Sequence, residues 1–299
     1  MSVFALKILA LTAMIIDHTG YFLRANSLIA YDPYNLMRAI GRIAFPIYCF
    51  LLVNGFDKSS NRRRYLSRLL LFAALSQIPY TLLFDYGSSF SLAQPVLSLG
   101  LAENGIICIA VALCALVAYA LLPGMDRGFV CLALFFLCGT LRLSLFGVEL
   151  LGAELNVFYT LSFGLAAMMV LEGLVYADVP LQKLLPAALI LVVSILLFQP
   201  AADYAWQGLA LIVALWLCRR SRPAQAAIMF LWCWWMYWPG TPVRFYFSLL
   251  SLPAVLLYNG KRGLRRAGLT LLFYAAYPLH LIALVVTRAL RVIPPYFFG

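Results

Sequence analysis

Long apolar runs separated by short polar segments dominate the sequence. A helix that crosses a lipid bilayer needs about 20 mostly apolar residues, and runs of roughly that length recur along the whole chain. They predict transmembrane spans at 4–23, 39–56, 66–84, 105–122, 129–146, 157–176, 184–199, 204–218, 225–238, 244–258 and 267–289. We therefore expect an all-α integral membrane protein, a polytopic bundle of about eleven (10–11) transmembrane helices.

The composition supports this interpretation. Hydrophobic residues make up 65% of the 299 residues and charged residues only 11%, whereas soluble domains carry about 25% charged residues. No polar linker divides the chain, so residues 1–299 are expected to form a single transmembrane domain. The net charge of +11 does not indicate a nucleic-acid partner, because the basic residues cluster in short loops between apolar runs.

The position of these basic loops predicts the orientation of the chain. Three loops between predicted spans carry most of the Lys and Arg residues, at 58–68, 219–222 and 261–266. With the spans above, all three fall on one side, which the positive-inside rule makes cytoplasmic. The N-terminus is therefore expected to be cytoplasmic. The first apolar run lacks a preceding basic region and a small-residue cleavage site, so we interpret it as a retained helix and not as a signal peptide.

The two histidines of the chain both lie inside predicted spans. His18 and His280 are each about 13–14 residues from the cytoplasmic end of their spans, so both lie roughly 20 Å deep. An imidazole titrates near neutral pH and can serve as a general base in acyl transfer. The matched depth permits one shared catalytic site, although a buried histidine is often only a hydrogen-bonding contact between helices.

Several other polar residues could serve such a site. Asp17 is about 100° from His18 around the helix, so it is expected to pair with Arg38, Arg42 or Arg142 on another helix. Lys7 lies about 16 Å below His18 along the helix, which is comparable to an extended pantetheine arm, and it could hold phosphates or simply reach the interface.

The remaining candidates are weaker. Arg38 and Arg42 are four residues apart and share a helix face, where they could face a polar cavity or lipid headgroups. Asn156 and Tyr159 open the sixth span and could donate hydrogen bonds into the site, although Asn156 is better explained as a helix cap. Glu172 is expected to pair with Arg142 or another helix. No cysteine or histidine cluster indicates a metal site.

Several motifs resemble the TraX family of conjugative pilin acetylases. They are Leu6–Leu11 with Met14–Gly20, Arg38–Ile47 with Asn54–Phe56, Tyr65–Leu70 with Ser76–Pro79, Asn156–Leu161, Leu257–Gly263 and Tyr274–Leu281, which contains Tyr277. The resemblance covers nearly the whole chain and is least specific over 100–150. The spacing of Lys7 and His18 is also similar to that of an Arg and a His in membrane acyltransferases that modify glycans, with Lys in place of the Arg.

The resemblance implies a multi-pass enzyme of the bacterial inner membrane that acetylates the amino terminus of a pilin, with acetyl-CoA as the donor and no metal. We predict that His18, Asp17 and His280 are catalytic. Substrate and cofactor binding is predicted for Lys7, Arg38, Arg42, Asn156, Tyr159 and Tyr277. The partners would be acetyl-CoA, a pilin or cell-surface glycan and membrane lipids. O-acetylation of a glycan or lipid-linked sugar, a transporter or flippase, and a purely structural subunit remain alternatives.

Overall fold

The computed structural model describes most of the chain outside one central region. It describes residues 1–84, 97–101, 141–145, 148–149, 154–176, helical positions between 185 and 196, 202–264 and 268–290. The spans predicted at 105–122, over most of 129–146 and over most of 184–199 lie outside the described residues. The remaining predictions can be compared with the structure directly.

Within the described part of the chain, five helical segments are long and apolar enough to cross a membrane. They are α1 (Val3–Ala25), the segment Tyr31–Lys58, which contains α2 (Tyr31–Gly41) and α3 (Ala44–Lys58), α4 (Arg62–Phe84), α7 (Val157–Tyr176, of which Val157–Val175 qualifies) and α13 (Leu269–Leu290, of which Leu271–Arg288 qualifies). The protein is therefore a helical membrane protein. Each of these segments overlaps a predicted span, although α2 begins eight residues before the span predicted at 39–56.

Four shorter helices lie between residues 202 and 264, a part of the chain that the structure describes. They are α9 (Ala205–Leu217), α10 (Arg222–Tyr237), α11 (Pro242–Ser248) and α12 (Ser251–Leu256). They occupy the places of the eighth, ninth and tenth predicted spans, but none reaches the usual length of a spanning helix. The predicted total of about eleven spans is therefore not confirmed.

A proline explains the break between α2 and α3. Pro46 has no backbone N–H, and its ring would collide with the carbonyl four residues earlier, which belongs to Arg42. The regular helix accordingly stops at Gly41, and Arg42 and Ile43 bond instead to carbonyls three residues back, at 3.1 and 3.2 Å. The single span predicted over 39–56 did not include this break, which places Arg42 at the junction of the two helices.

Three short antiparallel strands form a small sheet, which the all-α prediction did not include. They are β1 (Leu97–Leu101), β2 (Leu141–Leu145) and β3 (Val148–Glu149), with Leu97 opposite Leu145 and Ser144 opposite Glu149. The strand β2 occupies the end of the segment predicted as a helix over 129–146, so that part of the prediction was wrong. Alternation of Leu with Arg142 and Ser144 is a period-two pattern, which the hydropathy of the whole segment concealed.

The three basic loops meet at one end of the bundle, as the orientation argument requires. Lys58 donates to the hydroxyl of Tyr258 at 2.8 Å, and Arg222 donates to the backbone carbonyl of the same tyrosine. Residues Val3 and Phe4 donate to the carbonyls of Lys261 and Arg262. We call this the basic end; the histidines lie farther along the bundle.

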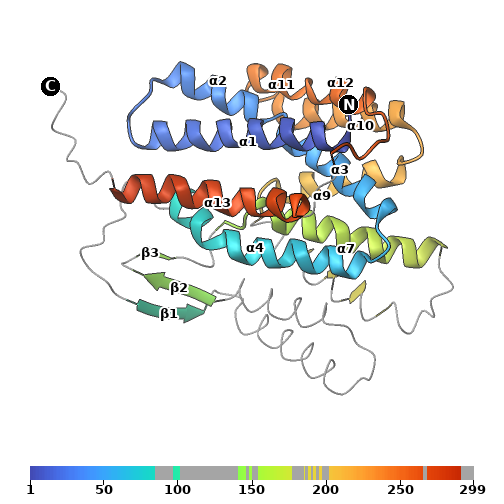
Figure 1. The fold of residues 1–299 in the computed structure, drawn as a ribbon, viewed down its shortest axis with the longest axis horizontal. Coiled ribbons are helices and arrows are strands. Elements are labelled where there is room, and N and C mark those ends of the chain that lie inside the picture. Colours follow the sequence, from blue (N-terminus) through green and yellow to red (C-terminus); the bar gives the residue numbers. More distant parts are fainter. Residues whose placement is uncertain are drawn as a thin grey trace.

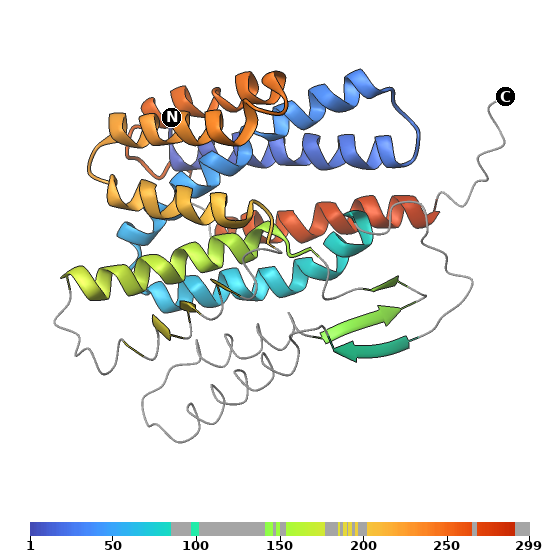
Figure 2. The same cartoon turned by 180° about the vertical axis from the view of Figure 1, so that it is seen from behind.

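The order of the helices brings distant parts of the sequence together. In Figures 1 and 2, α13 lies between α1 on one side and α4 and α7 on the other. The first helix of the chain therefore packs against the last described helix. This contact positions the candidate site.

Candidate functional site

The two histidines, 262 residues apart in sequence, are in direct contact. Nδ1 of His18 in α1 lies 2.6 Å from Nε2 of His280 in α13, and the rings stack at 4.9 Å between centroids. His18 is only 8% exposed. The shared site that the matched depth permitted is thus confirmed as a geometric fact, while its catalytic role stays a prediction.

The surrounding hydrogen bonds determine where the ring protons lie. Nδ1 of His280 is 2.9 Å from the carbonyl of Ala276, and a carbonyl only accepts, so this nitrogen carries a proton. In a neutral ring the other nitrogen, Nε2 of His280, must then accept from Nδ1–H of His18. The lone pair of His18 is consequently on its Nε2 atom. That nitrogen makes no hydrogen bond to any described residue.

Aromatic rings hold the histidine pair in place. Tyr277, one turn before His280, contacts both imidazoles edge-on, with centroid distances of 5.9 Å to His18 and 5.5 Å to His280. Phe84 at the end of α4 contacts His18 at 5.1 Å. These contacts restrict the rotation of the rings and keep Nε2 of His18 in one direction.

Asp17 forms a buried ion-pair cluster with α2. Its two carboxylate oxygens accept from Arg38 at 2.7 Å and from Arg42 at 2.8 Å. The prediction that Asp17 pairs with another helix and not with His18 is confirmed. Each carboxylate oxygen accepts from one arginine, so Asp17 is held as a buried anion between two cations.

A glycine makes this close approach possible. A Cβ atom on Gly41 would lie 2.3 Å from the Cβ and Oδ1 atoms of Asp17. Gly20 is similarly tight, because a Cβ there would lie 2.7 Å from Met37. Two small residues therefore let α1 and α2 touch, much as small residues do in other packed membrane helices.

Two residues near this cluster were not predicted as site residues. Tyr204, in the left-handed region with φ of 64°, stacks on Phe45 at 3.7 Å and its hydroxyl lies 3.4 Å from Nη1 of Arg42. Burial raises the pKa of the neighbouring Asp203 to about 6, although the positive charge of Arg42 opposes that rise. The sequence feature that could have identified this pair is an acid followed by an aromatic residue at the gap between two apolar runs.

A cavity of about 390 Å³ opens below the histidines toward the basic end. It reaches Met14 and Tyr277, one turn below His18 and His280 respectively, and at its other end it is lined by Lys58 and Ser59. Most of the upper wall is apolar, with Leu, Val and Phe side chains. The cavity therefore extends from the basic end to within one helical turn of the histidine pair, although neither histidine is among its lining residues.

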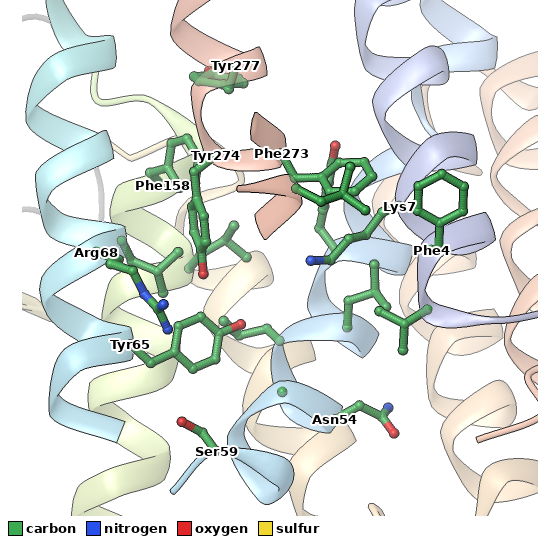
Figure 3. A pocket seen from close by; sticks show the side chains of 18 of the residues that line it. Phe4, Lys7, Asn54, Ser59, Tyr65, Arg68, Phe158, Phe273, Tyr274 and Tyr277 are labelled. Carbon is green, nitrogen blue, oxygen red and sulfur yellow. The ribbon is translucent and has the colours of Figure 1, made fainter. Parts of the chain in front are cut away.

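Lys7 lines this cavity, as its predicted role requires. Its ammonium lies 5.0 Å from the ring of Phe273, and Figure 3 shows it reaching into the cavity from α1 while Arg68 reaches in from α4. The lining contains four basic residues, Lys7, Lys58, Arg68 and Arg262, and none of the described lining residues is acidic. An anionic ligand fits such a wall.

The remaining predicted residues lie elsewhere. Asn156 is fully buried and caps α7: its Oδ1 accepts from the N–H of Phe158 at 3.1 Å, and its Nδ2 donates to Gln77 and to the carbonyl of Ala73. This favours the capping explanation over substrate contact. Tyr159 is also fully buried and is not among the residues that line the cavity.

Other predicted charges pair within the bundle. Glu172 pairs with Arg62 at the start of α4, which confirms the expected pairing with another helix. The alternative partner, Arg142, has its side chain outside the described residues. Arg288 donates to the carbonyls of Leu82 and Leu83 at the end of α4. No group of three or more potential metal ligands occurs among the residues that the structure describes.

Comparison with known proteins supports the resemblance seen in the sequence. The family model described as "TraX protein" matches residues 2–121 and 113–288. Over 80 residues the chain is 38% identical to the "Probable fimbrial assembly protein FimC, serogroup H1" of Dichelobacter nodosus, covering 27% of this chain and 32% of that protein. It is 39% identical over 80 residues to "Uncharacterized protein RP591" of Rickettsia prowazekii (strain Madrid E), covering 26% of this chain and 27% of that protein.

These two matches span about a third of each relative or less. No solved structure matches the chain. The family assignment therefore rests on the family model, which covers nearly the full length of the chain.

Proposed function

The chain belongs to the TraX family, and from that premise we propose that it is a membrane-embedded acetyltransferase that moves an acetyl group from acetyl-CoA to an acceptor. The favoured acceptor is the N-terminal amine of a pilin subunit. The observation that carries the proposal is the contact between His18 and His280. This pair lies one helical turn above a cavity whose described lining includes basic residues but no acidic ones.

The histidine pair suits the proton transfers of this reaction. The amine nitrogen attacks the thioester carbonyl carbon, the carbonyl π electrons move to oxygen, and Nε2 of His18 takes the amine proton. Collapse of the tetrahedral intermediate breaks the C–S bond, and the sulfur of CoA leaves with that proton. His280 would steady the transient imidazolium of His18, because its Nε2 accepts from Nδ1–H.

The remaining predicted residues take supporting roles in this proposal. Lys7 would hold phosphates of CoA with its thioester directed upward, since it lies on the cavity wall one pantetheine length below His18. Asp17, with Arg38 and Arg42, would fix the outer half of α1 and supply the electrostatic support for the histidines. Tyr277 would border the reacting carbonyl, because it lines the cavity and touches both rings.

A pilus-related role agrees with the printed name of the Dichelobacter nodosus relative, which concerns fimbrial assembly. Acetyl-CoA is made in the cytosol, so the enzyme would lie in the bacterial inner membrane with its basic end facing the cytosol. A hydroxyl of a surface glycan could use the same base. An acetyl-transfer assay with both acceptors distinguishes the amine from the hydroxyl.

The test is an acetyl-transfer assay with the purified protein in detergent. Labelled acetyl-CoA is incubated with a peptide that carries the pilin N-terminus, with the same peptide blocked at its amine, and with a surface glycan. The proposal expects label on the free amine only, and none with His18→Ala. Wild-type turnover by a folded His18→Ala protein would refute the assignment, and label only on the glycan would replace the amine with a hydroxyl acceptor.

A ligand-binding control separates the enzyme from a transporter or a structural subunit. CoA and acetyl-CoA should raise the melting temperature of the protein, whereas ATP should not, because ligand that binds the folded state stabilises it. No shift at millimolar CoA would count against the enzyme.

A further inference from the structure

The basic residues near the start of α4 divide sharply in what they contact. Arg62 pairs with Glu172, whereas Arg63 and Arg64 are exposed. Arg68 is half-buried and lines the cavity. In the sequence these residues form one basic cluster, and only the structure distinguishes Arg68, which lines the cavity, from its neighbours.

Arg68 forms no ion pair with a described acid, although it is half-buried. Its Nε atom is buried and makes no hydrogen bond to a described group. The guanidinium lies 5.9 Å from the ring centres of both Tyr65 and Tyr274. A cation that lines a cavity and has no acid beside it among the described residues is suited to receive an anion from that cavity.

Lys7 is the natural counterpart of Arg68. It enters the cavity from the opposite wall (Figure 3) and also lacks an ion pair with a described acid. Both positive charges line the same cavity. A ligand that brings negative charge between them would interact with both, and a flexible ammonium with a planar guanidinium suits two phosphate groups of different geometry.

The other two basic lining residues are poorer candidates. Lys58 already donates to the hydroxyl of Tyr258 and to the carbonyl of Gly260. Arg262 is exposed in the loop at the mouth of the cavity. The anion site is therefore placed inside the cavity and not at its rim.

We infer that Lys7 and Arg68 form a two-sided clamp for the phosphate groups of the acyl donor, with the ring of Tyr274 beside the bound anion. This rests on the proposed function and deepens it, because it assigns Arg68 as a residue that selects phosphate-bearing thioesters over shorter ones. The apolar wall above the clamp, with Phe158 and Leu161, then receives the part of the donor that carries no charge.

The experiment measures donor binding and turnover for wild type, Arg68→Gln and Arg63→Gln. Arg63 is the matched control, because the same charge is removed from an exposed position on the same helix. The ligands are CoA and pantetheine, which lacks every phosphate, and the assay donors are acetyl-CoA and acetyl-pantetheine. Melting temperatures and gel filtration confirm that each variant is folded.

The clamp predicts that Arg68→Gln weakens CoA binding and raises the KM for acetyl-CoA by roughly tenfold or more, since a hydrogen bond to a charged group is lost. Pantetheine binding and the KM for acetyl-pantetheine should be unchanged in Arg68→Gln. In Arg63→Gln, the binding of both ligands and the KM values for both donors should match those of the wild type. Arg68→Lys should recover part of the loss, because it keeps the charge but not the planar fork. Equal loss for pantetheine, or no loss for CoA, would overturn the inference.

A lipid headgroup offers the same phosphate chemistry, so the binding assay is repeated with and without phosphatidylglycerol in neutral detergent. Stabilisation by this lipid alone, dependent on Arg68 and absent with CoA, would overturn the donor assignment. Failure of the clamp and failure of the enzyme are distinguishable. Arg68-dependent CoA binding without acetyl transfer would refute only the proposed function, and acetyl transfer with an unchanged KM in Arg68→Gln would refute only the clamp.

Discussion

Nδ1 of His18 and Nε2 of His280 lie 2.6 Å apart, so a hydrogen bond links α1 to α13 within the helical bundle. The carbonyl of Ala276 fixes the proton on the far nitrogen of His280. The pair therefore resembles a base and its orienting partner, with Nε2 of His18 as the atom that can exchange a proton with a substrate.

Substitution of His280 tests this division of roles. We predict that His280→Ala lowers the rate of acetyl transfer by about a hundredfold, because His18 loses the acceptor that orients it. His280→Gln should recover much of the rate, since its side-chain oxygen can accept from Nδ1–H of His18. The measurement is initial acetyl-transfer rate at matched protein stability. Equally low rates in the two variants would show that His280 does more than accept this bond.

Gly41 is predicted to be intolerant of even one added methyl group. Gly41→Ala places a Cβ atom 2.3 Å from Asp17, so α1 and α2 must separate, at a cost of about 1–3 kcal/mol. Thermal unfolding in detergent measures the loss. Gly240→Ala is the matched control, because a Cβ there meets nothing within 4 Å, and comparable melting temperatures for the two variants would contradict the close contact.

Removal of the Asp17 carboxylate should destabilise the fold. Asp17→Asn leaves Arg38 and Arg42 without their acid partner, and breaking a buried ion pair costs about 3–5 kcal/mol. Adding Arg42→Gln should restore part of the stability, since one unpaired cation is then removed. Denaturation of the single and double variants gives the coupling. Strictly additive losses would mean that the two residues act independently.

The pH dependence of stability should contain a contribution from Asp203. Burial raises the pKa of its carboxyl to about 6 in the folded protein, above the ordinary value of 3.8. Between these two values the folded state binds more protons than the unfolded state, so this group makes stability fall as pH rises from about 4 to about 6. Asp203→Asn removes the effect.

The check compares melting temperatures of wild type and Asp203→Asn between pH 4 and 7.5. The melting temperature of the variant relative to wild type should rise through this window and level off above about pH 6. A difference that does not change with pH would contradict the raised pKa of Asp203.

Much of the helical framework was predictable from hydropathy alone. Apolar length located α1, α4, α7 and α13, whereas the break between α2 and α3 lies inside a single predicted span, 39–56. The strand Leu141–Leu145 was missed, because its residues are also apolar enough to extend a predicted helix. The short helices α11 and α12 were predicted as one span for the same reason.

The candidate site was only partly predictable. The equal depth of His18 and His280 followed from counting residues along two helices of the same direction. The selection of Arg68 from its neighbours did not follow, because sequence position does not reveal which arginine meets Glu172 and which faces a cavity. The capping role of Asn156 was favoured by its position at a helix start, and its hydrogen bonds agree.

The sequence by itself determined that this is a helical membrane protein and how far apart its polar groups lie along each helix, because lipid permits few charges and helix rise is constant. The tertiary structure decided which groups meet. Helix rotation and packing order, set by close contacts such as Gly41 against Asp17, turn His18 toward His280 and Arg68 toward the cavity. These lateral relationships depend on the fit of surfaces far apart in the chain, which hydropathy does not encode.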